Sequence, residues 1–419
     1  MTVRRALLAF VAVMAVTPAT AGAATLDARI ERLIARSQFA GSRTGLAVFD
    51  RTTGRYLAIH NGRQQLRPGS NMKLATSAAL FIRFGPSARL RTRIMASGPL
   101  SAGTVNGSLF LVGGGDPSLS TKPFARLVHG GGGTLLSDVA AAVRARGVRR
   151  VIGRIYGDES RFDSRRTGPL WKPSYWQDCP PISALSVNED LFNAGHPQAS
   201  PNPPLFAAQI LKKSLKNRGV VFQKGPSVRV HPSSAWVVAS VRSPHISRLV
   251  RQMDLPSDNY YAEVLTKALA VRAGLPGTTA NGTLTTRRSL RRIGVKMRGA
   301  SLMDGSGLSL GDHMSARQIS AILRRSALQS WGFYLHAALP VAGVSGTLRD
   351  RMRTGPAHGN AHAKTGTLNT ASALSGYVRS ANGHRLVFSI LQNRRPRLDV
   401  LAAHRLQDAI VQLLAGSNV

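Results

Sequence analysis

The chain has 419 residues and a formal net charge of +37, with 43% hydrophobic and 18% charged residues. That length is enough for two or three domains with large buried cores, and the composition excludes a wholly disordered chain. The charge favours anionic partners such as acidic wall polymers or a membrane surface, but no aromatic-interleaved basic segment concentrates it, so we expect a solvated basic surface and no specific nucleic-acid partner.

The first residues have the pattern of an export signal. Arg4 and Arg5 form a positive start, residues 6–16 are an apolar run, and Ala21-Gly22-Ala23 supplies the small residues of a cleavage site. The apolar run is shorter than the roughly 20 residues that span a bilayer. We therefore predict a signal peptide over residues 1–23, with an uncleaved anchor as the alternative, and export to the periplasm, the cell envelope or the extracellular space.

Residues 24–87 are predicted to form the first part of a mixed α/β (α+β) core. A turn with Gly54 joins two short apolar runs, which indicates a hairpin. A longer apolar run follows Ser70 and stops at Gly85-Pro86, which is typical of a helix end. The predicted elements are strands over residues 46–50 and 56–59 and a helix over residues 72–84.

Residues 88–235 are predicted to be an inserted β-rich module or modules. Short apolar runs alternate there with glycine-rich and proline-rich loops, and a structureless segment of this length would be unusual in a folded protein. Gly113-Gly114-Gly115-Asp116 is interpreted as a turn, because a phosphate-binding loop would continue with Lys and Ser or Thr. The predicted elements are strands over residues 109–112 and 151–156 and helices over residues 137–146, capped by Ser137, and 206–215.

Residues 236–419 are predicted to form the second part of the core. Strand and helix patterns alternate regularly there, and Asn382-Gly383 indicates a tight turn between two strands. The predicted strands cover residues 236–241, 362–368, 372–378 and 385–392. The predicted helices cover residues 259–272, a segment that begins at Ser315, and residues 399–414.

Cys179 is the only cysteine, which excludes an intrachain disulfide and a cysteine-rich zinc site. It lies between Asp178 and Pro180-Pro181 without a cysteine-hydrolase signature. The histidines are scattered and lack the His-Glu-x-x-His spacing of a metal hydrolase. We therefore predict no metal and no cofactor.

Three short motifs follow one another in the order Ser70-Asn71-Met72-Lys73, Ser257-Asp258-Asn259 and Lys364-Thr365-Gly366. Each alone is compatible with a purely structural role, as a helix cap or a solvated strand. Together, on two predicted helix starts and a strand, they resemble the motif set of penicillin-binding proteins and class A β-lactamases.

This arrangement predicts nucleophilic catalysis by Ser70. Free backbone N–H groups at a helix start favour the developing negative charge, and Lys73 lies one turn later on the same face. An ammonium group cannot accept a proton, so Lys73 must be neutral for part of the time. Burial beside the cation Lys364 is expected to lower its pKa.

The remaining motif residues are predicted to bind the substrate and relay protons. Ser257 passes a proton to the leaving amine, and Asn259 hydrogen-bonds a substrate amide. Lys364 attracts a terminal carboxylate, which Thr365 and Thr367 bind on the strand that also contains Gly366. The oxyanion is expected between the backbone N–H groups of Ser70 and Thr367.

The resemblance extends over nearly the whole mature chain. It identifies the family as the D-Ala-D-Ala carboxypeptidases and endopeptidases of the penicillin-binding protein 4 type, low-molecular-mass class C. The segments that carry it are residues 158–162, 183–193, 304–309, 339–343, 346–348, 362–368 and 374–377. The resemblance implies an antiparallel sheet flanked by helices, peptidoglycan stem peptides as substrate, and β-lactams as covalent inhibitors.

Two alternatives share the motifs. A slow β-lactamase would lack the class A deacylating glutamate, because Glu263 is the last glutamate and lies in the same predicted helix as Asn259. A non-enzymatic basic wall-binding protein would have no need for all of the intact motif residues. Removal of a terminal D-Ala and cleavage of a D-Ala cross-link use the same chemistry, so the sequence leaves that choice open.

Overall fold

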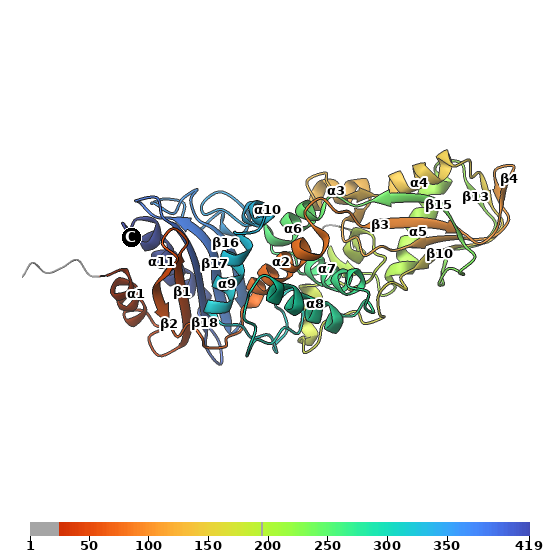
Figure 1. Ribbon diagram of the computed structural model, residues 1–419. Helices are drawn as coiled ribbons and strands as arrows, with labels where there is room; N and C mark the ends of the chain where they lie inside the picture. Colours follow the sequence, from red (N-terminus) through yellow and green to blue (C-terminus); the bar gives the residue numbers. More distant parts are fainter. Residues whose placement is uncertain (1–24, 194–195) are drawn as a thin grey trace, which may run out of the picture.

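The computed structural model describes residues 25–193 and 196–419, so the predicted signal peptide over residues 1–23 lies outside the described residues. Within the described part of the chain, no helix is long and apolar enough to cross a membrane. Figure 1 shows an elongated molecule with one sheet at each end and a group of helices between them.

The first sheet is built from both ends of the chain. Its strand order is β16-β17-β18-β1-β2, and all neighbours are antiparallel, so β16 is an edge strand. The strands are β1 (Arg43–Asp50), β2 (Arg55–His60), β16 (His362–Leu368), β17 (Ala371–Arg379) and β18 (Arg385–Asn393).

Both faces of this sheet are covered, and the alternation of side chains along β1 explains how. Leu46 and Val48 belong to one apolar core, together with residues of α1 (Leu26–Ala35) and α11 (Val400–Ala415). The intervening Ala47 and Phe49 belong to a second core, which includes residues of α9 (Ala316–Ser326). Because successive strand side chains point to opposite faces, one apolar strand supplies both cores.

The helices between the sheets carry the first two motifs. α2 follows Ser70 and α7 follows Asp258, and every residue from Tyr260 to Ala270 of α7 is buried, as expected for a central helix. The helices of this group are α2 (Met72–Phe84), α6 (Ile246–Asp254), α7 (Asn259–Arg272), α8 (Thr279–Arg292) and α10 (Gly332–Ala338).

The second sheet belongs to the inserted region and has the strand order β14-β10-β6-β3-β15. β14, β10 and β6 are mutually parallel, whereas β3 and β15 are antiparallel to their neighbours. Its strands are β3 (Arg91–Ala96), β6 (Leu109–Val112), β10 (Ile155–Asp158), β14 (Ser227–Val228) and β15 (Trp236–Arg242). The helices of this region are α3 (Lys122–Val128), α4 (Leu136–Ala145) and α5 (Pro203–Lys216).

Three smaller sheets complete the inserted region. One has the order β13-β9-β5-β4 and lies at the far end of the molecule (Figure 1), and the others are the pairs β7-β8 and β11-β12. Their strands are β4 (Leu100–Ser101), β5 (Thr104–Val105), β7 (Leu119–Ser120), β8 (Thr134–Leu135), β9 (Arg150–Val151), β11 (Leu191–Asn193), β12 (His196–Ala199) and β13 (Val221–Phe222).

The predicted fold class is confirmed, and two details of the predicted elements differ. The expected strand over residues 151–156 is two strands, β9 and β10, which pair in different sheets. Gly153 lies at the break, where a Cβ atom would be 2.6 Å from the carbonyl oxygen of Gly107. Ser137 is not an N-cap, because β8 leads directly into α4 and Leu135 is the capping residue. β15 pairs with β3, so we propose that the inserted region ends after Arg242 rather than at residue 235.

Candidate active site

Ser70 lies where the first part of the core, which leads into α2, meets strand β16 of the second part. It sits in a single 3-10 turn, Gly69–Asn71, that leads into α2, and β16 runs alongside this turn. A Cβ atom on Gly366 would be 2.7 Å from the carbonyl oxygen of Pro68 and 3.0 Å from the backbone nitrogen of Ser70. Only glycine lets the strand approach this closely, which brings the main chain of β16 next to the Ser70 N–H group.

The amine of Lys73 is buried and hydrogen-bonded on three sides. Its Nζ atom lies 3.0 Å from Ser70 Oγ, 2.6 Å from Asn259 Oδ1 and 3.0 Å from the carbonyl oxygen of Ser306. The side chain has no exposed surface. The predicted pair Ser70–Lys73 is therefore in direct contact, and Asn259 joins it from α7.

Burial lowers the pKa of Lys73 to about 8, because the charged form loses its hydration. The surrounding carboxylates, of which Asp258 has the largest effect and Asp304 the next, act in the opposite direction. The pKa of the amine is therefore close enough to neutral pH for the amine to exchange a proton with a hydroxyl group.

Lys364 is also fully buried, and its Nζ atom donates to the carbonyl oxygen of Thr365 at 3.0 Å. Burial, and next the charge of Lys73, lower the pKa of Lys364, whereas Asp254 raises it. The sequence predicted that burial beside the cation Lys364 would lower the pKa of Lys73. Burial is the largest cause of the lowered pKa for both amines, and the repulsion between them is seen at Lys364, whose pKa the charge of Lys73 lowers further.

The second motif forms the start of α7. Asp258 caps the helix through a 2.9 Å bond from the backbone nitrogen of Tyr261. Ser257, directly before it, has a φ of +68°, a left-handed conformation that is uncommon for serine and concentrated at functional sites. The Asn259 amide nitrogen donates to the carbonyl oxygen of Asp178 at 3.0 Å, so Asn259 bridges Lys73 and this loop.

The third motif lies on the edge strand β16. Thr365 Oγ1 is 2.7 Å from Thr347 Oγ1, and Thr367 is exposed at the end of the strand that passes Ser70. An ideal Cβ atom on Gly69 would be 3.4 Å from the backbone nitrogen of Thr367. The structure thus brings Ser70, Lys73, Asn259, Lys364 and the Thr365–Thr367 strand together, with Ser257 at the adjoining helix start.

Four further residues belong to this site and were not predicted. Asp254 is buried, accepts from Ser77 Oγ at 2.7 Å and is electrostatically coupled to both lysines. Glu263 accepts from the backbone nitrogens of Gly305 and Ser306 at 3.0 and 2.8 Å. Asn71 and Thr347 are the other two. Of these four, only Asn71 and Thr347 lay inside quoted motifs. Asn71 contacts Lys364, 293 residues away, and Thr347 contacts Thr365, 18 residues away.

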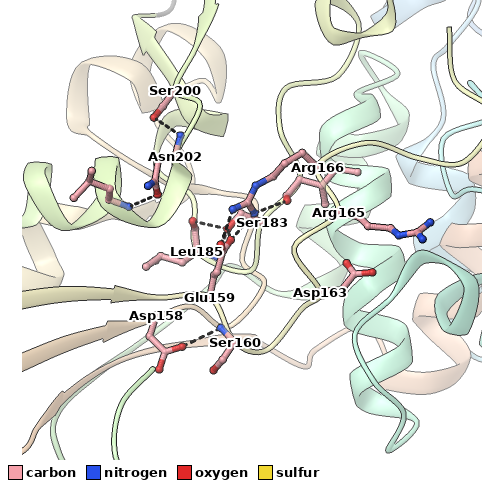
Figure 2. A network of polar contacts seen from close by, with 12 residues as sticks. Asp158, Glu159, Ser160, Asp163, Arg165, Arg166, Ser183, Leu185, Ser200 and Asn202 are labelled. Carbon is pink, nitrogen blue, oxygen red and sulfur yellow. Dashed lines mark hydrogen bonds and ion pairs between the residues drawn. The ribbon is translucent and has the colours of Figure 1, made fainter. Parts of the chain in front are cut away.

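The loop that touches Asn259 is fixed by the polar network in Figure 2. Arg166 forms a bidentate ion pair with Glu159, with N–O distances of 2.5 and 2.6 Å. Ser183 donates to the same carboxylate at 2.6 Å. These contacts close residues 159–183 into a loop. Because bidentate arginine–carboxylate pairs are geometrically specific, they hold the loop that contains Asp178 in a defined position next to Asn259.

Comparisons with known proteins show the family and the fold. The model of the D-Ala-D-Ala carboxypeptidase 3 (S13) family matches residues 26–200 and 194–417. A D-alanyl-D-alanine carboxypeptidase from Actinomadura sp. (strain R39) is 30% identical over 92% of this chain and 84% of its own length.

Two kinds of solved structure share the fold. Penicillin binding protein 4 from Haemophilus influenzae has a TM-score of 0.78 at 20% identity, over 91% of this chain and 97% of that chain, and it has also been solved with a β-lactam. A predatory peptidoglycan endopeptidase from Bdellovibrio bacteriovorus has a TM-score of 0.54 at 15% identity, over 88% of this chain and 92% of that chain.

Proposed function

The chain belongs to the D-Ala-D-Ala carboxypeptidase 3 (S13) family, and from this premise we propose that it hydrolyses the terminal D-Ala of peptidoglycan stem peptides through an acyl-enzyme on Ser70. The observation that carries the proposal is the 3.0 Å contact between Ser70 Oγ and the buried Nζ atom of Lys73. The family match disfavours the two alternatives, a slow β-lactamase and a non-enzymatic wall-binding protein.

Acylation begins with a proton transfer from Ser70 to Lys73. With a pKa of about 8, roughly a tenth of the Lys73 amine is neutral at pH 7 and can accept the hydroxyl proton. Ser70 Oγ then bonds to the carbonyl carbon of the penultimate D-Ala. The developing oxyanion is stabilised by the backbone N–H groups of Ser70 and Thr367.

Collapse of this intermediate breaks the peptide bond. The proton held by Lys73 passes to the leaving D-Ala nitrogen, directly or through the hydroxyl group of Ser257, and leaves the acyl-enzyme. Lys364, Thr365 and Thr367 on β16 bind the terminal carboxylate. Water then attacks the ester carbon and gives a proton to neutral Lys73. The bond between this carbon and Ser70 Oγ breaks, Ser70 Oγ takes the proton back from Lys73, and the shortened peptide leaves with a new terminal carboxylate.

Cleavage of a D-Ala cross-link is a second candidate activity. It forms the same acyl-enzyme and differs only in the amine that leaves. The observation that favours it is the fold shared with a peptidoglycan endopeptidase. β-Lactams, which present a strained amide to the same nucleophile, are proposed as covalent inhibitors.

The proposal includes a location outside the cytoplasm. Peptidoglycan lies outside the cytoplasmic membrane, and the basic start and apolar run of residues 1–23 fit export. The net charge of +37 supports electrostatic contact with anionic wall polymers or a membrane surface. Salt-dependent retention on purified wall tests that contact.

Digestion of purified stem-peptide monomers and cross-linked dimers tests the activity, with mass spectrometry of the products. Loss of one D-Ala from a monomer pentapeptide, abolished in Ser70→Ala, is the expected result. Conversion of dimers to monomers would add the endopeptidase activity. A folded wild-type protein that leaves both substrates intact would refute the proposed function.

A further inference from the structure

A basic surface lies at the C-terminal end of α8, in the group of helices between the two large sheets (Figure 1). Residues 264–303 of the chain contain no acidic residue. Basic residues gather in the last turns of α8 and in the loop that follows the helix. The α8 basic surface, as we call it, consists of Arg287, which is half-buried, and of the exposed residues Arg288, Arg291, Arg292, Lys296 and Arg298.

Part of this surface is concave. A cavity of about 570 Å³ lies between the end of α8 and the following loop. Arg325 approaches it from α9, because an ideal Cβ atom on Gly294, which lines the cavity, would be 3.5 Å from Arg325 Cζ. Cationic side chains from three segments therefore lie around one concave region. Those that line the cavity are Arg287, Arg291, Lys296 and Arg298.

The loop after α8 is held in place by contacts to its main chain. Gln318 Nε2 donates from α9 to the carbonyl oxygens of Lys296 and Arg298, at 3.3 and 2.9 Å. Arg287 donates to two further carbonyl oxygens of the same loop, at 3.1 and 2.8 Å. Met297 is buried, whereas Lys296 and Arg298 on either side of it are exposed. The positions of these two cations relative to α8 are thus fixed before any ligand binds.

Carboxylates do not compensate the charge of this surface. In residues 25–193 and 196–419, neither its six basic side chains nor Arg325 form an ion pair. Burial, and next the charges of Arg292 and Arg272, lower the pKa of the neighbouring Arg83, so these cations repel one another. The helix dipole favours cations in the last turn of α8, but the loop residues lie beyond that turn. The surface therefore attracts anions.

The arrangement of the cations favours phosphodiester groups. Guanidinium groups donate two parallel hydrogen bonds to two oxygens, which suits phosphates and carboxylates. A carboxylate accepts mainly in its own plane, whereas the oxygens of a phosphodiester accept from several directions, which matches cations that come from three segments. Several cations along one surface also suit a chain of repeated anions, because each contact releases counterions.

Two other kinds of polyanionic partner fit this surface less well. Peripheral membrane binding uses apolar side chains that enter the bilayer, and in the part of the chain that the structure describes, Leu284 is the only exposed large apolar residue of α8 or the loop after it. Single-stranded nucleic acids stack on aromatic side chains, and residues 264–303 contain no aromatic residue.

We propose that the α8 basic surface binds a linear phosphodiester polymer of the cell envelope. The binding is independent of the hydrolysis at Ser70. It rests on the export that is part of the proposed function, and it gives the electrostatic contact proposed there a defined place and a defined partner chemistry. A bound polymer holds the enzyme near the wall and so raises the local concentration of its substrate.

The test compares two triple variants of the full protein that remove the same charge. The test variant is Arg291→Gln/Lys296→Gln/Arg298→Gln, at three exposed positions of the α8 basic surface. The matched control is Arg146→Gln/Arg149→Gln/Arg150→Gln, at three exposed arginines between the end of α4 and the start of β9 in the inserted region.

The probe is poly(glycerol phosphate), titrated against each protein at several salt concentrations. We expect the test variant to bind it about tenfold more weakly than the wild type at low salt, and the slope of log Kd against log salt to fall by about two, at about 0.7 per lost contact. The control should keep the affinity and the slope of the wild type. Unchanged binding in the test variant, or equal losses in the two variants, would overturn the site.

Two further probes distinguish the other partners. Vesicles of phosphatidylglycerol and phosphatidylcholine represent a membrane, and poly-L-glutamate represents a carboxylate polymer. If the loss of affinity in the test variant is largest for poly(glycerol phosphate), the proposal is supported. An equal or larger loss for either of the other probes would show that the surface is not selective for a phosphodiester polymer, and the proposal would be wrong.

Labelling of Ser70 by a fluorescent penicillin separates this failure from failure of the proposed function. Both variants should be labelled at the rate of the wild type, which also shows that they are folded. A wild type that binds the polymer but takes no label refutes the function alone. A labelled protein whose test variant and control bind the polymer alike refutes only the α8 basic surface as a binding site.

Discussion

The side-chain amide of Asn71 donates a 3.0 Å hydrogen bond to the main-chain oxygen of Lys364. Asn71 follows the nucleophile directly, and Lys364 begins the third motif on β16. The bond is buried and joins segments 293 residues apart in the chain. It therefore fixes the relative position of the two parts of the core at the point where catalysis takes place.

Replacement of Asn71 by Ala tests this connection. It leaves a buried carbonyl group without its donor, which costs about 1–3 kcal/mol. We expect a lower free energy of unfolding by that amount in urea titrations, and slower acylation by penicillin. Asn217→Ala, at the exposed end of α5, is the control and should change neither quantity. Equal stability of Asn71→Ala and wild type would show that the bond does not join the two segments.

The pH dependence of acylation tests the role of Lys73. The neutral amine is the reactive form, and its pKa is about 8, so the second-order rate constant for penicillin should rise about tenfold per pH unit below that value and level off above it. Rapid-mixing measurements from about pH 6 to about pH 9.5 cover the transition. A rate that falls as the pH rises through this range would mean that the protonated amine is the active form.

Glu263 is predicted to act through its position rather than by touching the substrate. Its carboxyl accepts from the N–H groups of Gly305 and Ser306, and the carbonyl group of Ser306 holds Lys73. Burial raises the pKa of this carboxyl, so the neutral amide of Gln is a close substitute.

We therefore expect Glu263→Ala to reduce the acylation rate at least tenfold and to shift the pH profile that reports Lys73. The reason is that the backbone N–H groups of Gly305 and Ser306 lose the carboxyl oxygen to which they donate. Glu263→Gln should restore most of the rate and the original profile. If the two variants behave alike, the carboxyl oxygen does not position Ser306.

Gly366→Ala tests the close approach of β16 to the Ser70 turn. The added Cβ atom would lie 2.7 Å from the carbonyl oxygen of Pro68, so the strand or the turn must shift. Such a shift of the strand or the turn moves the backbone N–H groups at the oxyanion site. We expect it to lower the acylation rate at least tenfold.

The matched control is Gly225→Ala, where only Arg154 Nη1 lies within 4 Å, at 3.8 Å from the added atom. It should leave acylation unchanged. Unaltered acylation in a folded Gly366→Ala protein would show that the strand tolerates a side chain at this point.

The sequence predicted the elements whose signals are local. The helix at residues 72–84 and the helix at residues 259–272 agree with α2 and α7 at both ends, and residues 362–368 agree with β16. Each has a clear stop or cap close by, such as Gly85-Pro86 after α2 and Asp258 before α7. The capping box at Ser315 likewise marks the start of α9.

What the sequence missed depends on contacts between distant segments. Lys73 meets the carbonyl group of Ser306 across 233 residues, and no local pattern indicates which carbonyl group will lie there. The break between β9 and β10 depends on Gly153, which packs against Gly107 in the connection between β5 and β6. The pairing of β15 with β3 is likewise not visible in the composition of either strand.

The mass of the intact protein after exposure to a penicillin tests the central claim most directly, because it counts covalent bonds to the nucleophile. The wild type should gain the mass of one penicilloyl group, located on the peptide that contains Ser70. Ser70→Ala should gain none, and Lys73→Met should gain it at least a hundredfold more slowly. A folded wild type that gains no mass, or a Ser70→Ala protein that is labelled as fast as the wild type, would contradict the account.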